Sequence, residues 1–425
     1  VVRKEKGFTS HDVVAKLRGI LHMKKIGWVA IAAAGLLGAC HPVSEGYTIH
    51  GTLTGEHVDG KVYLECLDSL NNPVTVDSTE MKEGKFVLSG AVSAPSMHYL
   101  VIDTNRPGEK ADLRNRKFRA MFYLDNSDIS FSGDVATLPG YYYSTTRKTV
   151  APAVTGSPTH DLFLQMNAGL KPLTDTLSAV NERYLNEYYV PELEGKEVDE
   201  SVGKALVREE RKWNDRLLQA KLDFIKGNAR SVVALDQAIV LFSDPNMSFT
   251  SAQMDELLGW FEPYWKGTSE WERLERTAAS VRWMAIGEKY KDVEVLDRNG
   301  QTVRLSSLIP EGEYVMLEFW ASWCGPCRAE IPHLRKVHEK YKDFAIVSIS
   351  VDEKESEWQK ALKEEKMDWT QGRMEGGIYG EAAQQYHIMS VPMCLILDKE
   401  GRFYKSNVRG AYLDAFLEDL YAGKL

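Results

Sequence analysis

The last third of the chain alternates strand-like and helix-like segments, and this alternation constrains the fold more than any other feature. A hairpin pattern comes first, with Asn299-Gly300 in its turn. The segments that follow read as strand, helix, strand, helix, hairpin and helix: "YVMLEFW", "GPCRAEIPHLRKVHEKY", "FAIVSISVD", "SEWQKALKEEK", "PMCLILDKEGRFYKS" and "AYLDAFLEDLYAG". Unbroken apolar runs are typical of strands buried on both faces of a parallel sheet. Residues 287–425 are therefore predicted to form an α/β domain.

The rest of the chain predicts two regions of different class. A length of 425 residues suits two or three domains. Short alternating segments broken by turn residues predict an antiparallel β-sandwich or barrel within 40–145. Apolar residues at every third or fourth position predict an α-helical region over 156–285, with Ser157 as an N-cap before Pro158 and a helix end at Gly227-Asn228. The sequence thus predicts a multidomain protein.

An apolar stretch near the N-terminus has the features of a signal peptide. Lys24 and Lys25 precede an apolar run from Ile26 to Leu37. About 12 residues are too few to span a bilayer but suit the core of a signal peptide. The run ends in "LGAC", which resembles the lipobox of bacterial lipoproteins. The resemblance implies a signal peptide over 23–39 and acylation of Cys40, which would anchor the protein to a lipid membrane. The alternative is a buried N-terminal helix with an incidental cysteine.

The segment before this leader has a different resemblance. Residues 2–27, "VRKEKGFTSHDVVAKLRGILHMKKIG", resemble the opening of tRNA pseudouridine synthases of the TruB type. The catalytic loop that follows in that family is absent, so no synthase activity is expected. We interpret residues 1–22 as a spurious or upstream extension joined at the shared "MKKIG" through a gene-model or assembly error. A chance amphipathic helix is the alternative.

Net charge and cysteine content argue against two broad classes of protein. The net charge of −9 argues against a general nucleic-acid binder. Five cysteines in a chain of this length are too few for a fold that depends on a disulfide framework. Cys66 and Cys394 each stand alone in an apolar, strand-like run, and both are expected to be buried, inert thiols.

Cys324 and Cys327 form a CxxC pair whose chemistry has to be decided among three options. A structural zinc site needs two more ligands, and no second CxxC exists. His333 and His338 lie on the same predicted helix as Cys327, so they cannot complete a tetrahedron; no metal is expected. A structural disulfide is also disfavoured, because closing so short a loop removes little entropy from the unfolded chain.

A redox-active dithiol needs a reactive thiolate, a base and a docking edge, and the sequence offers a candidate for each. Cys324 falls where a strand ends and a helix begins, and a helix N-terminus lowers a thiol pKa. We expect Cys324 to be exposed and to attack, and Cys327 to be buried and to resolve the mixed disulfide. Glu318 is the candidate base if it is buried, although a surface carboxylate is the alternative. Val391-Pro392 would leave the preceding backbone free to pair with substrate if the bond is cis; an ordinary trans proline is the alternative.

These residues carry a family resemblance. "FWASWCGPC" and the segment from Gly287 to the end are similar to membrane-anchored proteins of the TlpA/ResA class, which have the thioredoxin fold. The resemblance implies that the pair cycles as a redox-active disulfide with no other cofactor. It makes Cys324 the attacking cysteine, Cys327 the resolving cysteine and Trp323 the flanking indole. It also makes Glu318 the buried acid, Pro332 the helix-kinking proline and Pro392 the cis-proline. Many members of the class carry an uncharged residue at the position of Glu318.

The resemblance implies a function and leaves alternatives open. The β-rich part resembles an uncharacterised domain found before thioredoxin-like domains in lipoproteins of Gram-negative bacteria. We expect a lipid-anchored oxidoreductase of the cell envelope that faces the periplasm, takes electrons from a membrane thiol donor and reduces exported proteins that bear disulfides. Apocytochrome c, as in cytochrome c maturation, other lipoproteins and general thiol rescue all remain candidate substrates. A thiol peroxidase and a non-catalytic ligand- or protein-binding lipoprotein are the alternative functions.

Overall fold

The computed structural model describes residues 45–68, 72–105, 108, 110–142, 147–244 and 249–424. The predicted signal peptide, the predicted acylation site at Cys40 and the segment that resembles a pseudouridine synthase lie outside these residues. Within the described ranges, no helix combines the length and the apolar character that crossing a membrane requires.

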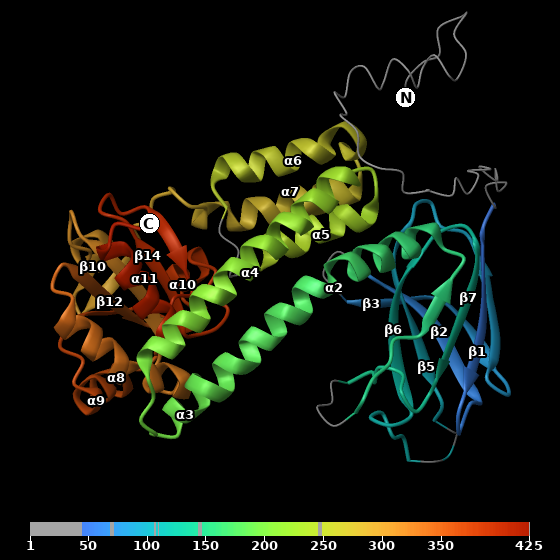
Figure 1. Cartoon of the computed structure of the whole chain (residues 1–425), viewed down its shortest axis with the longest axis horizontal. Helices are drawn as coiled ribbons and strands as arrows, with labels where there is room; N and C mark the ends of the chain where they lie inside the picture. The colour runs from blue at the N-terminus through green and yellow to red at the C-terminus, as the bar shows by residue number, and fades with distance from the viewer. Residues whose placement is uncertain are drawn as a thin grey trace, which may run out of the picture. The chain divides into compact units, whose positions relative to one another are not determined.

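The first described region is a sandwich of two four-stranded sheets (Figure 1). One sheet has the order β4-β1-β7-β8, with bounds Lys85–Gly90, Tyr47–Thr54, Asp128–Asp134 and Ala153–Thr155. The other has the order β3-β2-β5-β6, with bounds Pro73–Met81, Gly60–Leu67, Ser96–Asp103 and Lys117–Leu124. Alternate apolar side chains of both sheets form one core, among them Ile49, Val62, Leu100, Phe122 and Phe131. The predicted β-sandwich is confirmed.

One strand pair of the sandwich departs from the predicted antiparallel arrangement. Strands β1 and β7 are parallel, with Ile49 opposite Ile129, whereas the other pairs are antiparallel. Strands β2 to β6 intervene between β1 and β7, so no tight hairpin forces the two to run in opposite directions. The apolar pattern within one strand does not indicate whether a strand far along the chain pairs with it in the parallel or the antiparallel direction.

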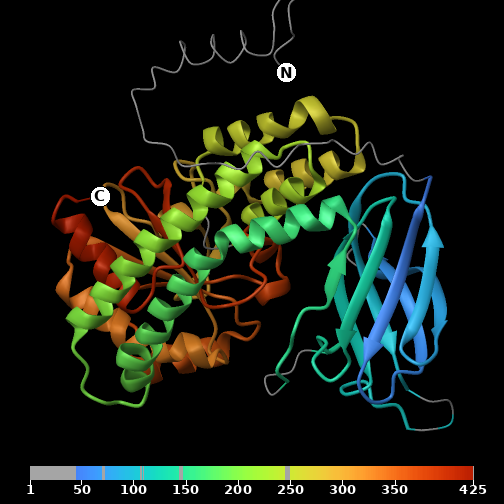
Figure 2. The same ribbon diagram turned by 45° about the vertical axis from the view of Figure 1, so that its right-hand side comes forward.

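The second region is helical. Its helices are α2, α3, α4, α5, α6 and α7, with bounds Pro158–Tyr184, Val190–Leu193, Glu200–Gly227, Val232–Ser243, Ser251–Trp265 and Ser269–Val281. Helix α2 begins as predicted, with the Ser157 side chain accepting a hydrogen bond from the N–H of His160 and Pro158 in the first turn. Helix α4 ends at the predicted Gly227, with Asn228 as its C-cap. Helices α2 and α4 run side by side in both views (Figures 1 and 2).

A π-helical turn, η1 (Leu185–Tyr189), interrupts the helical path between α2 and α3. Tyr188 of this turn is buried against α4 at Gly203. A Cβ atom at Gly203 would lie only 2.7 Å from the Tyr188 ring, so a glycine is required for this approach. Tyr184 and Tyr188 also pack against Ala411 and Ala415 of the C-terminal region.

The third region has a seven-stranded sheet with the order β10-β9-β13-β12-β11-β14-β15. The strand bounds in that order are Thr302–Arg304, Glu294–Asp297, Thr370–Arg373, Phe344–Ser350, Tyr314–Trp320, Met393–Leu397 and Phe403–Ser406. The helices are α8, α9, α10 and α11, with bounds Gly325–Lys340, Glu355–Glu365, Glu381–Gln385 and Ala411–Tyr421. Strands β13, β12 and β11 are parallel, and β14 is antiparallel to β11. The predicted α/β domain with the thioredoxin fold is confirmed.

Candidate active site

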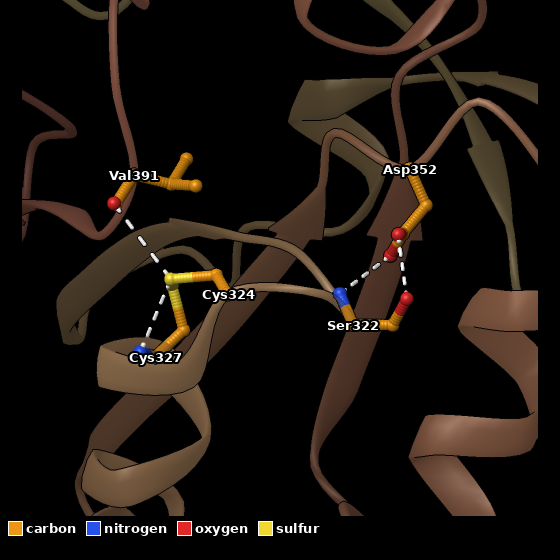
Figure 3. The surroundings of a disulfide bond; sticks show 5 residues. All are labelled: Ser322, Cys324, Cys327, Asp352 and Val391. Carbon is orange, nitrogen blue, oxygen red and sulfur yellow. Dashed lines mark hydrogen bonds between the residues drawn. A yellow bond between two sulfur atoms is a disulfide. The ribbon is translucent and has the colours of Figure 1, made fainter.

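The CxxC pair lies at the junction of a central strand and a helix. Strand β11 ends at Trp320, and α8 begins at Gly325 with Cys324 as its N-cap residue. The N–H of Cys327 donates a hydrogen bond to the Sγ atom of Cys324 at 3.2 Å (Figure 3). The two Sγ atoms are bonded to each other at 2.11 Å. Free N–H groups and the positive end of the helix dipole therefore surround the Cys324 sulfur, as predicted, and such an environment stabilises a thiolate.

The expectation that Cys324 is exposed is wrong. Only 4% of its surface is accessible, and Cys327 is fully buried. The Cys324 sulfur is bonded to Cys327 and also lies 3.7 Å from the carbonyl oxygen of Val391, which approaches from a distant segment (Figure 3). The exposed side chain at this position is instead that of Trp323, at 61%.

The peptide bond between Val391 and Pro392 is cis, as the sequence predicts for this pair. Pro392 directly precedes strand β14, the antiparallel neighbour of β11. The carbonyl group of Val391 thus stands beside the sulfur of Cys324. The substrate-binding roles of Trp323, Val391 and Pro392 remain predictions.

Glu318 lies on β11 and is buried, with 1% of its surface accessible. This confirms the predicted burial and excludes the alternative of a surface carboxylate. The pKa of Glu318 is raised to about 7, chiefly by burial and also by the nearby charge of Glu330, while a hydrogen bond from Ser348 and the charge of Arg409 oppose the rise. Ser348 donates that bond from Oγ to Oε2 of Glu318 at 2.6 Å. A carboxyl group with this pKa can both accept and return a proton near neutral pH.

The two single cysteines differ in environment. Cys394 stands opposite Glu318 in the pairing of β11 with β14 and is fully buried, as expected. Burial raises the pKa of the Cys394 thiol, and the charge of Glu318 adds to this effect. Cys66, by contrast, is only half-buried, because it lies near the end of β2, which ends at Leu67. The expectation of a buried thiol is therefore wrong for Cys66.

Asp352 is a site residue that the sequence analysis missed. Its carboxylate accepts hydrogen bonds from the backbone N–H of Ser322 at 2.9 Å and from the Ser322 hydroxyl at 2.7 Å (Figure 3). The hydroxyl of Ser350 donates a third bond at 2.7 Å, and Asp352 is fully buried. Asp352 therefore holds the turn that leads from β11 to Cys324. The available signal was an acidic residue directly after the apolar strand "FAIVSISV".

A second missed cluster surrounds His333 on α8. The two ring nitrogens of His333 lie 3.0 Å from Glu330 Oε1 and 3.0 Å from Asp414 Oδ1 of α11. Although burial opposes it, the hydrogen bonds that His333 donates to the carboxylates of Asp414 and Glu330 raise its pKa to about 10. His333 is thus a cation between two carboxylates at neutral pH. The cluster joins the helix that carries the cysteines to α11.

Comparisons with known proteins find relatives for two regions of the chain. Residues 47–163 match the model of a domain of unknown function (DUF4369), and residues 286–405 match the AhpC/TSA family. The thioredoxin-like protein YneN of Bacillus subtilis (strain 168) is 32% identical over 139 residues, which cover 32% of this chain and 78% of that protein. The thiol-disulfide oxidoreductase ResA of Bacillus thuringiensis subsp. konkukian (strain 97-27) is 26% identical over 138 residues, covering 32% of this chain and 76% of that protein. A solved structure of the thioredoxin domain of a thiol-disulfide oxidoreductase from Bacteroides vulgatus is 30% identical, covers 32% of this chain and 97% of that chain, and has a TM-score of 0.30.

Proposed function

Because the chain belongs to the thioredoxin-like thiol-disulfide oxidoreductases, we propose that it reduces disulfides of exported proteins through the dithiol of Cys324 and Cys327. The observation that supports this most is the position of the Cys324 sulfur. This sulfur accepts a hydrogen bond from the N–H of Cys327 at the start of α8, an environment that favours a thiolate over a thiol.

The reaction begins with the reduced enzyme. The thiolate of Cys324 attacks one sulfur of the substrate's disulfide, and the other substrate sulfur leaves with the electron pair of the broken bond. Cys327 then gives its thiol proton to the carboxylate of Glu318 and attacks the sulfur of Cys324 in the mixed disulfide. The second substrate sulfur leaves as a thiolate and is protonated through Glu318. Two electrons pass to the substrate, and a dithiol donor in the membrane must return them to the Cys324–Cys327 disulfide.

The substrate would dock beside the sulfurs. The indole of the preceding residue, Trp323, is exposed, and the backbone carbonyl oxygen of Val391 lies 3.7 Å from the Cys324 sulfur. An extended polypeptide that carries a cysteine fits this arrangement, since it can pair with the backbone before Pro392 and cover the indole.

We place the enzyme at the cell envelope, anchored through acylated Cys40 and facing the periplasm. The support is the leader pattern that precedes Cys40. Fractionation of cells that express Cys40→Ala tests the anchor: the protein should leave the membrane fraction, and full retention there would contradict acylation at this residue.

The reduction potential of the Cys324–Cys327 disulfide in the whole protein tests the reducing direction. The intervening Gly325-Pro326 dipeptide is that of thioredoxin. Equilibration with a thiol buffer should therefore give a potential near that of thioredoxin, about −270 mV. A potential near that of a strong oxidase, about −120 mV, would overturn the proposed direction.

A further inference from the structure

A buried chain of hydrogen bonds leads from the candidate base into the sheet. The indole Nε1 of Trp369 donates to Oγ of Ser348 at 2.9 Å, and Oγ of Ser348 donates to Oε2 of Glu318 at 2.6 Å. Ser348 stands opposite Glu318 in the parallel pairing of β11 with β12, and Trp369 directly precedes β13. All three side chains are buried.

The donors and acceptors of these groups fix the direction of the chain. An indole N–H can only donate, and a hydroxyl has a single proton to give. Because Trp369 occupies an acceptor position of the Ser348 oxygen, the one hydroxyl proton of Ser348 is directed to Glu318. A hydrogen bond donated to a carboxylate favours its ionised form, and this effect is strong where water is excluded.

We propose that Ser348 and Trp369 are positioning residues for the proton transfer between Cys327 and Glu318. Trp369 orients the hydroxyl of Ser348, and Ser348 engages Oε2 of Glu318, which leaves Oε1 as the oxygen that exchanges the proton. The inference rests on the proposed function, because it assigns these residues to the step that resolves the mixed disulfide. Nothing in the sequence pattern distinguishes Ser348 or Trp369 from ordinary core residues.

Other charged and titratable groups also face Glu318. The charges of Glu330 on α8 and of Arg409, just before α11, act on Glu318, and Cys394 of β14 stands opposite it. The carboxylate of Glu330 is itself hydrogen-bonded to the ring of His333 on the same helix, and it accepts a hydrogen bond from the backbone N–H of Gly410 at 2.8 Å. Within the described part of the chain, Ser348 is the residue that donates a hydrogen bond to the Glu318 carboxylate. Removing this donor is therefore the sharpest way to shift the titration of Glu318 without altering a charge.

Trp369→Phe tests the inference, because it keeps most of the ring volume and removes only the N–H donor. The reduced whole protein is mixed with oxidised glutathione, and rapid acid quench with mass spectrometry follows the mixed disulfide on Cys324 and its resolution. In Trp369→Phe the hydroxyl of Ser348 is free to turn away from Glu318, so the acid limb of the resolution rate should move up by about one pH unit. Near pH 6 this slows resolution by about tenfold. Ser348→Ala is a second variant and should shift the limb in the same direction.

Trp358→Phe is the matched control. Trp358 of α9 is fully buried in the same core, and its Nε1 has no hydrogen-bond partner within the described residues. The substitution disturbs packing comparably but removes no donor from the chain, so the pH limb should stay in place. A limb that is unchanged in Trp369→Phe and Ser348→Ala, or shifted equally in Trp358→Phe, would overturn the inference. A wild-type protein that forms no mixed disulfide on Cys324 would instead overturn the proposed function.

Discussion

At the scale of single residues, Glu318 is an ionisable group whose buried environment departs strongly from water. A carboxylate on a central strand loses its hydration, and Ser348 and Arg409 only partly compensate for this loss. The resulting pKa of about 7 is poorly suited to a structural role but well suited to the exchange of a proton with a thiol. The folded protein therefore bears a free-energy cost at Glu318, which agrees with the proposed role of this carboxyl group as a base.

This cost gives a pH-dependent stability prediction. The pKa of Glu318 is raised on folding, so the folded state loses stability as the pH rises from the ordinary value of 4.5 to about 7. Glu318→Gln cannot ionise and should avoid this loss. Urea unfolding should show a gain over the wild type that grows by roughly 3 kcal/mol between pH 4.5 and pH 8. A difference that stays constant across this range would contradict the assigned pKa.

Structural features that depend on neighbours in the sequence could be predicted, whereas contacts that depend on distant partners could not. The CxxC pair, the acid in an apolar strand and Val391-Pro392 are local patterns. Asp352 acts on Ser322 across 30 residues, and His333 meets Asp414 across 81. The burial of Cys324 was missed for the same reason, since the Val391 carbonyl that covers it lies 67 residues away.

At the scale of secondary-structure elements, α8 has two functional parts. Its N-terminus holds the cysteines, and its middle is fixed to α11 by the ion cluster of His333, Glu330 and Asp414. Pro332 lies inside α8, as predicted, next to this cluster. Because a proline removes one backbone hydrogen bond of the helix, the contacts of His333 help to hold α8 in place where its own ladder is broken.

The His333 cluster predicts a second pH dependence, in a different window. The folded-state pKa of His333 is raised to about 10, so its contribution is complete below the ordinary 6.5 and is lost as the pH rises towards 10. His333→Gln lacks the positive charge and should reduce the free energy of unfolding by a few kcal/mol at pH 6. The deficit should shrink markedly by pH 9 in urea titrations. An equal deficit at both pH values would mean that His333 acts through packing alone.

The strands and helices themselves were largely predictable, because the period of apolar residues is a local property. The π-helical turn at Leu185–Tyr189 was not, because "LNEYY" carries no breaker and its conformation reflects the packing of Tyr188 against Gly203. The parallel pairing of β1 with β7 likewise depends on how separate strands meet.

At the scale of the whole molecule, the helical region contacts the domain that carries the active site. Arg208 of α4 donates to Asp419 of α11 at 2.8 Å and to Glu418 at 3.1 Å, and Lys204 and Arg211 add further bonds to these carboxylates. These partners lie more than 200 residues apart, so no local sequence pattern could predict the contact. Asp419 is buried and depends on this interface for its ion pairs.

Arg208→Ala should weaken this interface selectively. Asp419 would keep Arg211 but lose its shortest partner, at a cost of roughly 1–3 kcal/mol. Hydrogen exchange should accelerate in α4 and α11, while the rate with oxidised glutathione should not change, because no site residue is touched. Arg183→Ala removes only exposed ion pairs, with Glu187 of η1 and Glu209 of α4, and is the matched control, expected to have little effect. Unchanged exchange in Arg208→Ala would show that apolar packing alone holds the interface.

The central claim is that Cys324 attacks and Cys327 resolves, and trapping tests it most directly. Cys327→Ser, expressed in the cell that makes the protein, should accumulate mixed disulfides between Cys324 and exported proteins. These are detected as covalent adducts that a reductant cleaves. The double variant Cys324→Ser/Cys327→Ser should form none of them. The absence of adducts in Cys327→Ser under oxidising conditions, or the same adducts in the double variant, would contradict the account.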